Sequence, residues 1–256
     1  MNSKICPYIF LPLFLFIFIS ENVKSQNSTN QDSTRLIGVQ AGFAYEIPGG
    51  IMAERFGSNA NVGGGFFFKT KSNIIFQLEG SYIFGENLKE DTLFHLIRNP
   101  DGFIIDGDGM FADIRTYQRG YTIMLNAGKV FNIFNDNPNS GLLLMAGGGF
   151  LQHRIRIENP GKTVGQLQGD YKKGYDKLTN GPALSQYIGY VHFSDNNISN
   201  FRIGFQFTQG FTKARRNYDF DYGKKDTRSR LDLLYGIKIN WKIPFRRKQP
   251  EAYYFF

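Results

Sequence analysis

The sequence contains one cysteine, one tryptophan and, after residue 25, no long apolar run. Cys6 is the cysteine and precedes an apolar stretch near the N-terminus, so we expect neither a disulfide nor a lipid-modified cysteine in the mature chain. The remaining sequence also lacks a transmembrane helix, because a helix needs about 20 apolar residues to cross a bilayer. What the chain does contain is glycine, aromatic residues and basic charge, with a formal net charge of +8.

Residues 1–25 are predicted to be a signal peptide. Lys4 supplies the positive end, residues 9–20 are apolar and uncharged, and residues 23–25 place small side chains where a signal peptidase reads them. A membrane anchor is the alternative, but the run is short for a spanning helix. Cleavage is expected before Gln26. An exported chain with no second apolar run is either soluble or a closed barrel, which satisfies every backbone polar group in lipid.

Alternation with a period of two runs through the rest of the chain and predicts β-strands. In residues 74–84, Phe76 and Leu78 share one face, while Gln77 and Glu79 share the other. The expected strands are residues 35–45, 61–71, 74–84, 117–129, 142–157, 183–193, 201–211 and 231–245. Most are long enough to cross a membrane at a tilt, which takes about 9–11 residues. The facing of 142–157 and 183–193 stays open.

Connector length supports the same interpretation. Long polar segments follow the first, third, fifth and seventh strands, and short ones follow the second, fourth and sixth, as in outer-membrane barrels. The inner face is small and mildly polar, which suits the filled interior of a narrow barrel better than the wet face of a sandwich. We therefore predict an all-β protein, an eight-stranded antiparallel up-and-down transmembrane β-barrel in the outer membrane. It spans residues 35–245, between a periplasmic segment (26–34) and a periplasmic tail (246–256).

The C-terminal quarter resembles a known family. FQFTQGFTKARRNYDFD from Phe205, RLDLLYGIKINWKIPFRRKQPEAYYFF after it, and the earlier GPALSQYIGYVHFSD are similar to small outer-membrane barrels of Bacteroidetes-type bacteria. These include OmpA-transmembrane-like barrels and accessory barrels of type IX secretion. The resemblance implies the fold and the compartment and carries no catalytic residue. It also implies a role as an accessory component of outer-membrane machinery, in secretion or barrel assembly.

Glu79, Arg202 and Lys238 are predicted to point into the barrel. A carboxylate in a narrow, poorly hydrated lumen must be paired or neutral, because an isolated buried charge is costly. The three residues either form a structural ion network or act as a proton or ion relay, and the structural role is favoured. Eight strands leave room only for side chains, which disfavours an open pore. A narrow channel or small-ligand transporter remains an alternative.

No catalytic residue, metal site or cofactor is predicted. A histidine-based hydrolase or acyltransferase is the enzymatic alternative, but nothing fixes a serine beside His95, His153 or His192. Four aspartates in the second long loop suggest calcium, yet turn chemistry explains their Asp-Gly pairs and the closing glutamate is absent. They are Asp101, Asp106, Asp108 and Asp113. The glycine runs 63–65 and 147–149 lack the lysine of a phosphate loop and indicate close packing of strands.

Function is expected to lie in the loops, because the wall and the lumen are committed to folding. The second long loop, residues 85–116, is too apolar for a solvated loop and is predicted to dock another outer-membrane protein or lipoprotein. Its candidate contacts are Phe94, Leu96, Ile97, Phe103, Ile104 and Phe111. The fourth long loop is basic, and outside the membrane the available anions are lipopolysaccharide phosphates. Its candidate contacts are Lys213, Arg215, Arg216, Lys224, Lys225 and Arg228. A non-enzymatic structural or accessory subunit is therefore the expected function.

Overall fold

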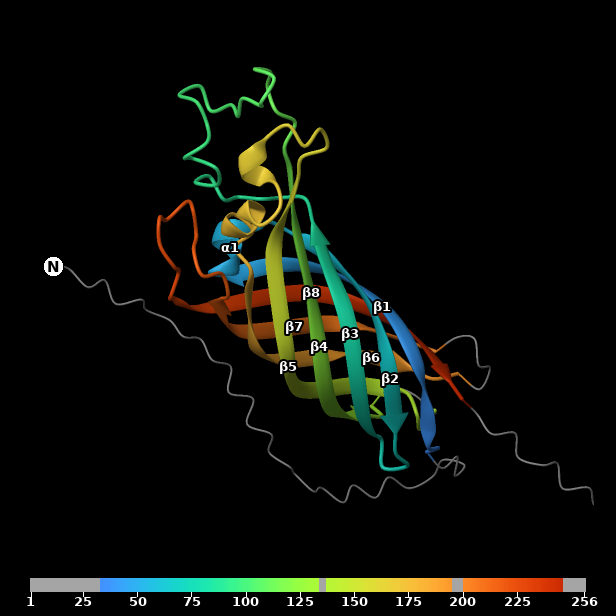
Figure 1. Cartoon of the computed structure of the whole chain (residues 1–256). Coiled ribbons are helices and arrows are strands. Elements are labelled where there is room, and N and C mark those ends of the chain that lie inside the picture. The colour runs from blue at the N-terminus through green and yellow to red at the C-terminus, as the bar shows by residue number, and fades with distance from the viewer. Residues whose placement is uncertain (1–32, 134–136, 195–199, 246–256) are drawn as a thin grey trace, which may run out of the picture. The chain divides into compact units, whose positions relative to one another are not determined.

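Eight antiparallel strands close into a barrel in which β1 pairs with both β2 and β8 (Figure 1). The structure is a computed structural model that describes residues 33–133, 137–194 and 200–245. The strands are β1 (Leu36–Gly50), β2 (Asn59–Lys69), β3 (Ile74–Gly85), β4 (Arg115–Phe131), β5 (Gly141–Glu158), β6 (Thr179–His192), β7 (Phe201–Ala214) and β8 (Ser229–Pro244). The predicted signal peptide, most of the N-terminal segment and the C-terminal tail lie outside the described residues.

The alternation of the sequence becomes the two faces of the barrel wall. On β3, burial alternates residue by residue from Ile74, exposed, to Gly85, buried. Large apolar side chains such as Phe43, Phe76 and Ile237 point outward on most strands, as a lipid-facing wall requires. The structure also settles the facing of β5 and β6, where Leu151, His153 and Tyr187 point inward. The eight predicted strands are confirmed, as is the facing of the six strands for which alternation predicted one.

Several strands are longer at the loop end than the alternation predicted. β1 continues to Gly50, β6 begins at Thr179 and β7 continues to Ala214. Polar residues at these strand ends interrupt the apolar alternation. The backbone hydrogen bonds between strands continue past them, because strand pairing does not depend on a lipid-facing side chain. The first predicted long loop, residues 46–60, thus becomes the end of β1, one helical turn and the start of β2. That turn is α1 (Met52–Arg55).

Side chains fill the barrel interior in layers. An apolar cluster at the end with short turns includes Phe67, Leu143 and Phe193, and another at the loop end includes Ile83 and Leu151. Polar and charged side chains occupy the middle, as described below. Gly65 shows how closely the strands pack, since a Cβ at this position would lie 2.0 Å from the carbonyl oxygen of Leu78. The filled interior agrees with the narrow bore of an eight-stranded barrel.

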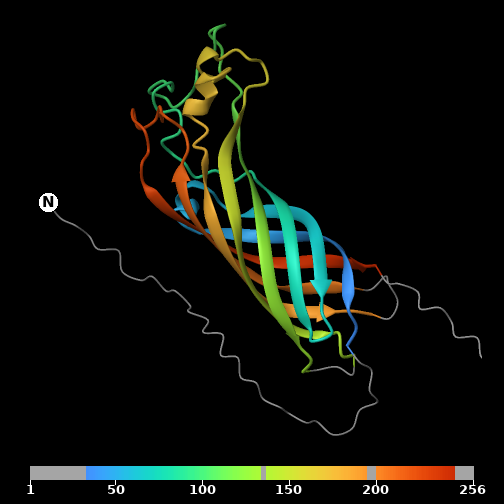
Figure 2. The same ribbon diagram turned by 60° about the horizontal axis from the view of Figure 1, so that its bottom comes forward.

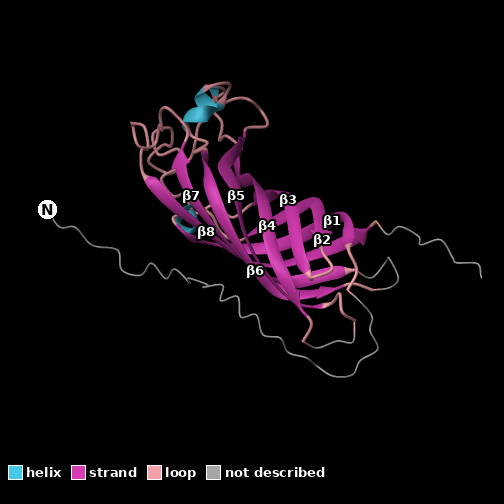
Figure 3. Cartoon of the chain, turned by 90° about the horizontal axis from the view of Figure 1, so that it is seen from below, coloured by secondary structure: helices cyan, strands magenta, loops and turns pink. Residues whose placement is uncertain are grey.

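The long connectors and α1 gather at one end of the barrel (Figure 2). Among the described residues, helix occurs only as short pieces at this end, namely α1, η1 (Gly165–Leu167) and η2 (Tyr171–Gly174) (Figure 3). None of the helices in the described ranges is long and apolar enough to cross a membrane. Long loops are extracellular in outer-membrane barrels, so we assign this end to the cell exterior.

Candidate functional site

Three charged side chains meet in the middle of the lumen. Glu79 on β3 lies between Arg202 on β7 and Lys238 on β8. Its Oε2 is 3.2 Å from Arg202 Nη2, and its Oε1 forms an ion pair with Lys238 Nζ. All three side chains are buried, so the carboxylate has the partners that a charge in these surroundings needs. The structure thus brings together the three residues that alternation placed on the inner face.

Two glutamines that the sequence analysis did not single out complete the contacts of Glu79. Gln40 Nε2 donates a hydrogen bond to Glu79 Oε2 at 2.9 Å, and Gln77 Nε2 donates to the same oxygen. Gln40 Oε1 accepts from Lys242 Nζ at 2.6 Å, which brings a third cation into the network. Alternation predicts the inward facing of all these residues, but their common height depends on strand register.

Arg202 is held on the side away from Glu79. Its Nε donates to Asn240 Oδ1 at 2.8 Å, and its guanidinium carbon lies 4.5 Å from the centre of the Tyr187 ring. Contacts on opposite sides of the guanidinium group hold Arg202 in one orientation. A relay needs a group that can change partners, whereas Glu79 and Arg202 are each held by several partners and Lys238 pairs with Glu79. The geometry favours a structural network.

His153 belongs to a second buried polar group nearer the loops. Its Nε2 donates to Asp232 Oδ2 at 2.9 Å, and the Thr212 hydroxyl donates to that same oxygen. The imidazole packs edge-on against Phe56, which follows α1, with ring centres 5.5 Å apart. Thr212 bonds the acid and not the imidazole, so the arrangement is not a nucleophile paired with a base. The group is enclosed, since His153 and Asp232 are both about 1% exposed.

The aspartates of the second loop make turns and surface pairs. Asp106 Oδ1 accepts the backbone N–H groups of Asp108 and Met110 at 3.0 and 2.9 Å, which closes a hairpin tip. Asp113 pairs with Arg115 at 2.8 Å. In the ranges that the structure describes, no three histidine, cysteine or acidic side chains are grouped to hold a metal ion. Turn formation accounts for Asp106, as the Asp-Gly spacing suggested.

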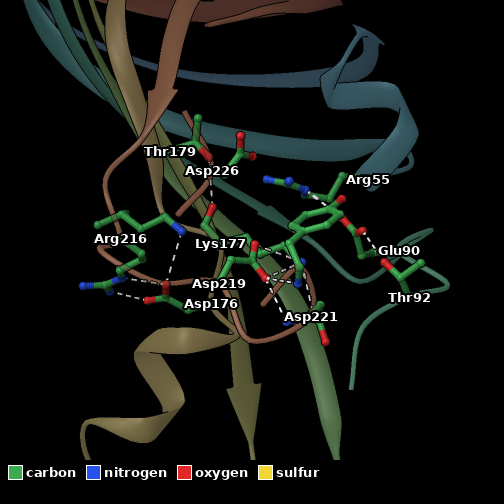
Figure 4. Close-up of polar contacts among 12 residues, drawn as sticks. Arg55, Glu90, Thr92, Asp176, Lys177, Thr179, Arg216, Asp219, Asp221 and Asp226 are labelled. Carbon is green, nitrogen blue, oxygen red and sulfur yellow. Dashed lines mark hydrogen bonds and ion pairs between the residues drawn. The ribbon is translucent and has the colours of Figure 1, made fainter. Parts of the chain in front are cut away.

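A buried ion cluster ties three extracellular loops together (Figure 4). Lys177, from the loop before β6, lies 3.2 Å from Asp219 Oδ2 and 2.9 Å from Asp221 Oδ2, both in the loop after β7. Asp221 Oδ1 also accepts the backbone N–H of Phe94 in the second long loop at 2.9 Å. Because these carboxylates and the ammonium are buried, breaking one partner would leave an uncompensated charge.

Backbone strain is concentrated at the same cluster. Phe94 and Lys177 have φ values of +67° and +46°, in the left-handed region that side chains other than glycine rarely adopt. Asp221 contacts both residues, through the Phe94 backbone and the Lys177 ammonium. Strained conformations persist only where the surroundings impose them, and they gather at functional sites. The second, third and fourth long loops therefore pack together over the end of the barrel. We call this packed structure the cap.

Much of the basic fourth loop is neutralised within the cap. Arg216 pairs with Asp176, and Arg228 pairs with Asp226, which also binds Arg230. Burial acts to raise the pKa of the Asp226 carboxyl, but hydrogen bonds from Arg228 and Arg230 outweigh burial and hold that pKa well below its usual range. Arg216 and Arg228 thus already have acidic partners. Of the predicted lipopolysaccharide contacts, the exposed ones without a carboxylate partner in the described ranges are Lys213, Arg215, Lys224 and Lys225.

The second loop contributes part of its apolar content to the chain's own core. Leu93, Phe94 and Ile104 are buried against α1, the upper barrel and the third loop, and Ile97 packs partly against them. Phe94 also contacts the Tyr175 ring, with centres 5.3 Å apart. The barrel and the neighbouring loops together bury these side chains, because the barrel mouth alone is too narrow to enclose them. Phe94 and Ile104 thus cannot contact a partner unless the cap opens.

The remaining apolar residues of the same loop are exposed. Leu96, Phe103 and Phe111 are 63%, 52% and 69% exposed, and Ile105 and Met110 are also exposed. The Phe103 and Phe111 rings lie 4.8 Å apart on a short hairpin, in which Ile105 bridges to Phe111. A cleft of about 490 Å³ opens beside them. Its apolar lining includes Leu88, Leu93, Phe103, Ile104, Ala112 and Ile114.

No protein-family model matches the sequence, and no curated protein matches it. Among solved structures, the chain is similar to Neisserial surface protein A, with 11% identity, a TM-score of 0.45, and coverage of 82% of this chain and 97% of that one. It is also similar to Ail, the attachment invasion locus protein of Yersinia pestis, with 7% identity, a TM-score of 0.44, and coverage of 81% and 98%. A structure of Ail in complex with the heparin analogue sucrose octasulfate gives 7% identity, a TM-score of 0.39, and coverage of 82% and 99%.

The wall and the interior of the barrel show which structural class of protein this chain is. Eight strands close without a free edge, the outward side chains are apolar, and the interior is filled. A closed barrel with such a wall satisfies its backbone internally and presents hydrocarbon to lipid. The chain is an eight-stranded transmembrane β-barrel of the outer membrane.

Proposed function

We propose that the chain is a structural or accessory subunit of an outer-membrane complex and binds a partner protein through its second extracellular loop. The observation that supports this most is the exposed apolar surface of that loop, formed by Leu96, Phe103, Ile105, Met110 and Phe111. We call these five residues the apolar loop surface. Exposed apolar side chains gathered on one loop mark an interaction site, and here the Phe103 and Phe111 rings lie 4.8 Å apart.

The apolar loop surface is rigidly mounted, which suits binding. Its hairpin is closed by backbone bonds from Asp106 N–H to Met110 carbonyl (2.9 Å) and from Ala112 N–H to Ile104 carbonyl (2.9 Å). Ile104 anchors the hairpin to the buried cap. A surface that is ordered before binding loses less conformational entropy when a partner docks. The adjacent cleft of about 490 Å³ is lined by apolar side chains and by the charged Glu90, Asp91 and Arg98, so it suits an amphipathic segment of that partner.

Two alternative functions find less support. A channel or transporter needs a path through the lumen, but buried side chains occupy the lumen at both apolar ends and at the Glu79 network. A hydrolase needs an accessible nucleophile beside its base, whereas His153 is enclosed with Asp232 and Thr212. The similarity of the C-terminal quarter to small barrels of Bacteroidetes-type bacteria favours secretion or barrel assembly as the machinery served.

Site-specific photo-cross-linking tests the docking proposal. A photoreactive phenylalanine analogue replaces Phe111, and the membranes are irradiated before extraction. We expect a discrete cross-linked protein adduct. The matched control places the same analogue at Tyr171 on the third loop, which is 67% exposed and so offers comparable access. Phe103→Ser with Phe111→Ser should remove copurification of the adducted protein without loss of the folded barrel.

The point substitutions are preferable to deleting the loop. A deletion from Leu93 to Phe111 would also remove buried residues of the cap, so its loss of binding would be ambiguous. Equal protein adducts at positions 111 and 171, or unchanged copurification in the double variant, would contradict docking at the apolar loop surface.

A further inference from the structure

A polar chain of side chains crosses the outside of the barrel wall. Tyr121 on β4, Gln152 on β5, Asn180 on β6 and Lys213 on β7 stand opposite one another in neighbouring strands. Tyr121 Oη donates to Gln152 Oε1 at 3.3 Å, and Asn180 Nδ2 donates to that oxygen at 3.1 Å. These residues face away from the lumen, next to a band of apolar outward residues that includes Ile123 and Leu125 on β4.

A row of cations lies one step nearer the loops on the same wall. Arg119 on β4 is directly opposite Arg154 on β5, and the backbone N–H of Arg215, just after β7, bonds to Leu178 before β6. Arg215 Nε also donates to Asn180 Oδ1, which joins the two rows. Like charges directly opposite each other destabilise a strand pair, and a bound anion near Arg119 and Arg154 would offset this repulsion.

Among the described residues, no nearby carboxylate pairs with Arg119 or Arg154. Glu158, further up β5, pairs with Arg156 at 2.8 Å. Arg119 instead donates to the carbonyl oxygens of Gln118 at 2.7 Å and Gly85 at 3.4 Å and lies over the Tyr117 ring, so its partners are neutral. Across the described ranges, no ion pair joins a carboxylate to the four outward cations Arg119, Arg154, Lys213 and Arg215, which we call the wall cations.

The wall cations lie at the outer boundary of the lipid. On β4, the next outward charge below Arg119 is Lys129, and the outward residues between them are Tyr121, Ile123, Leu125 and Ala127. Ten residues extend about 33 Å along a strand, or about 25 Å along the membrane normal at a tilt of about 40°. This equals the apolar height of such barrels, about 25 Å, so Arg119 and Lys129 mark the two lipid headgroup levels.

We propose that the outer wall of β4–β7 binds a phosphorylated glycolipid of the outer leaflet, of the lipid A type. The wall cations bind its phosphates, because guanidinium groups match phosphate oxygens in charge and geometry. Gln152 and Asn180 bind sugar hydroxyls, and the acyl chains lie on the apolar outward residues beneath, such as Ile123. The basic residues of the fourth loop predicted lipopolysaccharide contacts in that loop but no site on the barrel wall. The wall site is also independent of the proposed docking surface.

Lipid retention measured by native mass spectrometry tests the site. The barrel is purified in detergent, supplied with bisphosphorylated lipid A, monophosphorylated lipid A or phosphatidylethanolamine, and the bound lipid is quantified. We expect preference in the order given. Arg119→Gln with Arg154→Gln should weaken binding of bisphosphorylated lipid A by about tenfold or more, because charge-assisted contacts to phosphate are lost.

Lys129→Gln is the matched control, since it removes an outward cation from the other end of the same strand. It should leave lipid A binding unchanged, and all variants should keep the unheated gel mobility of a folded barrel. Equal retention by the double variant and the wild type would overturn the proposal, as would an equal loss in Lys129→Gln. Displacement of lipid A by an equal concentration of inorganic phosphate would also overturn it, in favour of a site for free anions.

Discussion

Replacing Glu79 by glutamine tests whether the lumen network stabilises the barrel. Glu79→Gln keeps the shape of the side chain but removes the charge that Arg202 and Lys238 face, leaving two buried cations without their carboxylate. Removing one partner of a buried pair typically costs about 3–5 kcal/mol, because the other charge stays buried. We expect the free energy of unfolding to fall by about this amount.

The measurement uses urea or guanidinium unfolding of the barrel in lipid vesicles. Trp241 is the only tryptophan in the sequence and lies on the outer face of β8, so its fluorescence reports exit from the lipid. The matched control is Asp113→Asn, which removes an exposed carboxylate paired with Arg115 and should change stability by less than about 1 kcal/mol.

A double variant separates lost pairing from a general defect. Adding Lys238→Met to Glu79→Gln removes one of the stranded cations, so part of the lost stability should return, as expected for directly coupled residues. A change below about 1 kcal/mol in Glu79→Gln would refute the structural role. Unchanged stability together with loss of the chain's function would indicate a relay instead.

Three further predictions concern the cap and the wall. Lys177→Met should leave Asp219 and Asp221 buried without their cation, so limited proteolysis should cleave the loops faster while the barrel keeps its unheated gel mobility. Asp226 has a lowered pKa when folded, so its stabilising effect is complete above the unfolded value near 4 and is lost as pH falls through the folded value. The protection factors of the amides around Asp226, which correct for the intrinsic slowing of exchange in acid, should therefore fall as pH drops below about 4, and Asp226→Asn should weaken this dependence. Gly65→Ala should cost about 1–3 kcal/mol of unfolding free energy, because its Cβ would meet the Leu78 carbonyl, whereas Gly80→Ala has open space and should stay near neutral.

The sequence alone determined the barrel, its strand count and the facing of six of its strands, while β5 and β6 stayed open. These follow from a local rule, since successive side chains on a strand point to opposite faces whatever the strand pairs with. The same rule placed Glu79, Arg202 and Lys238 on the inner face before any contact was known. It also identified the loops as the unusual part of the chain, because their apolar content exceeds what a solvated loop requires.

Only the tertiary structure decided which residues share a height and how the loops fold. Register brings Gln40 to Glu79 and sets Arg119 opposite Arg154, and alternation cannot supply this because it specifies a face but no level on the barrel. The cap depends on contacts between loops that are distant in sequence, such as Asp221 with Phe94. Irregular segments have no repeating pattern that would reveal such pairings. For that reason the sequence indicated an apolar docking loop, but the structure showed which of its residues support the cap and which face outward.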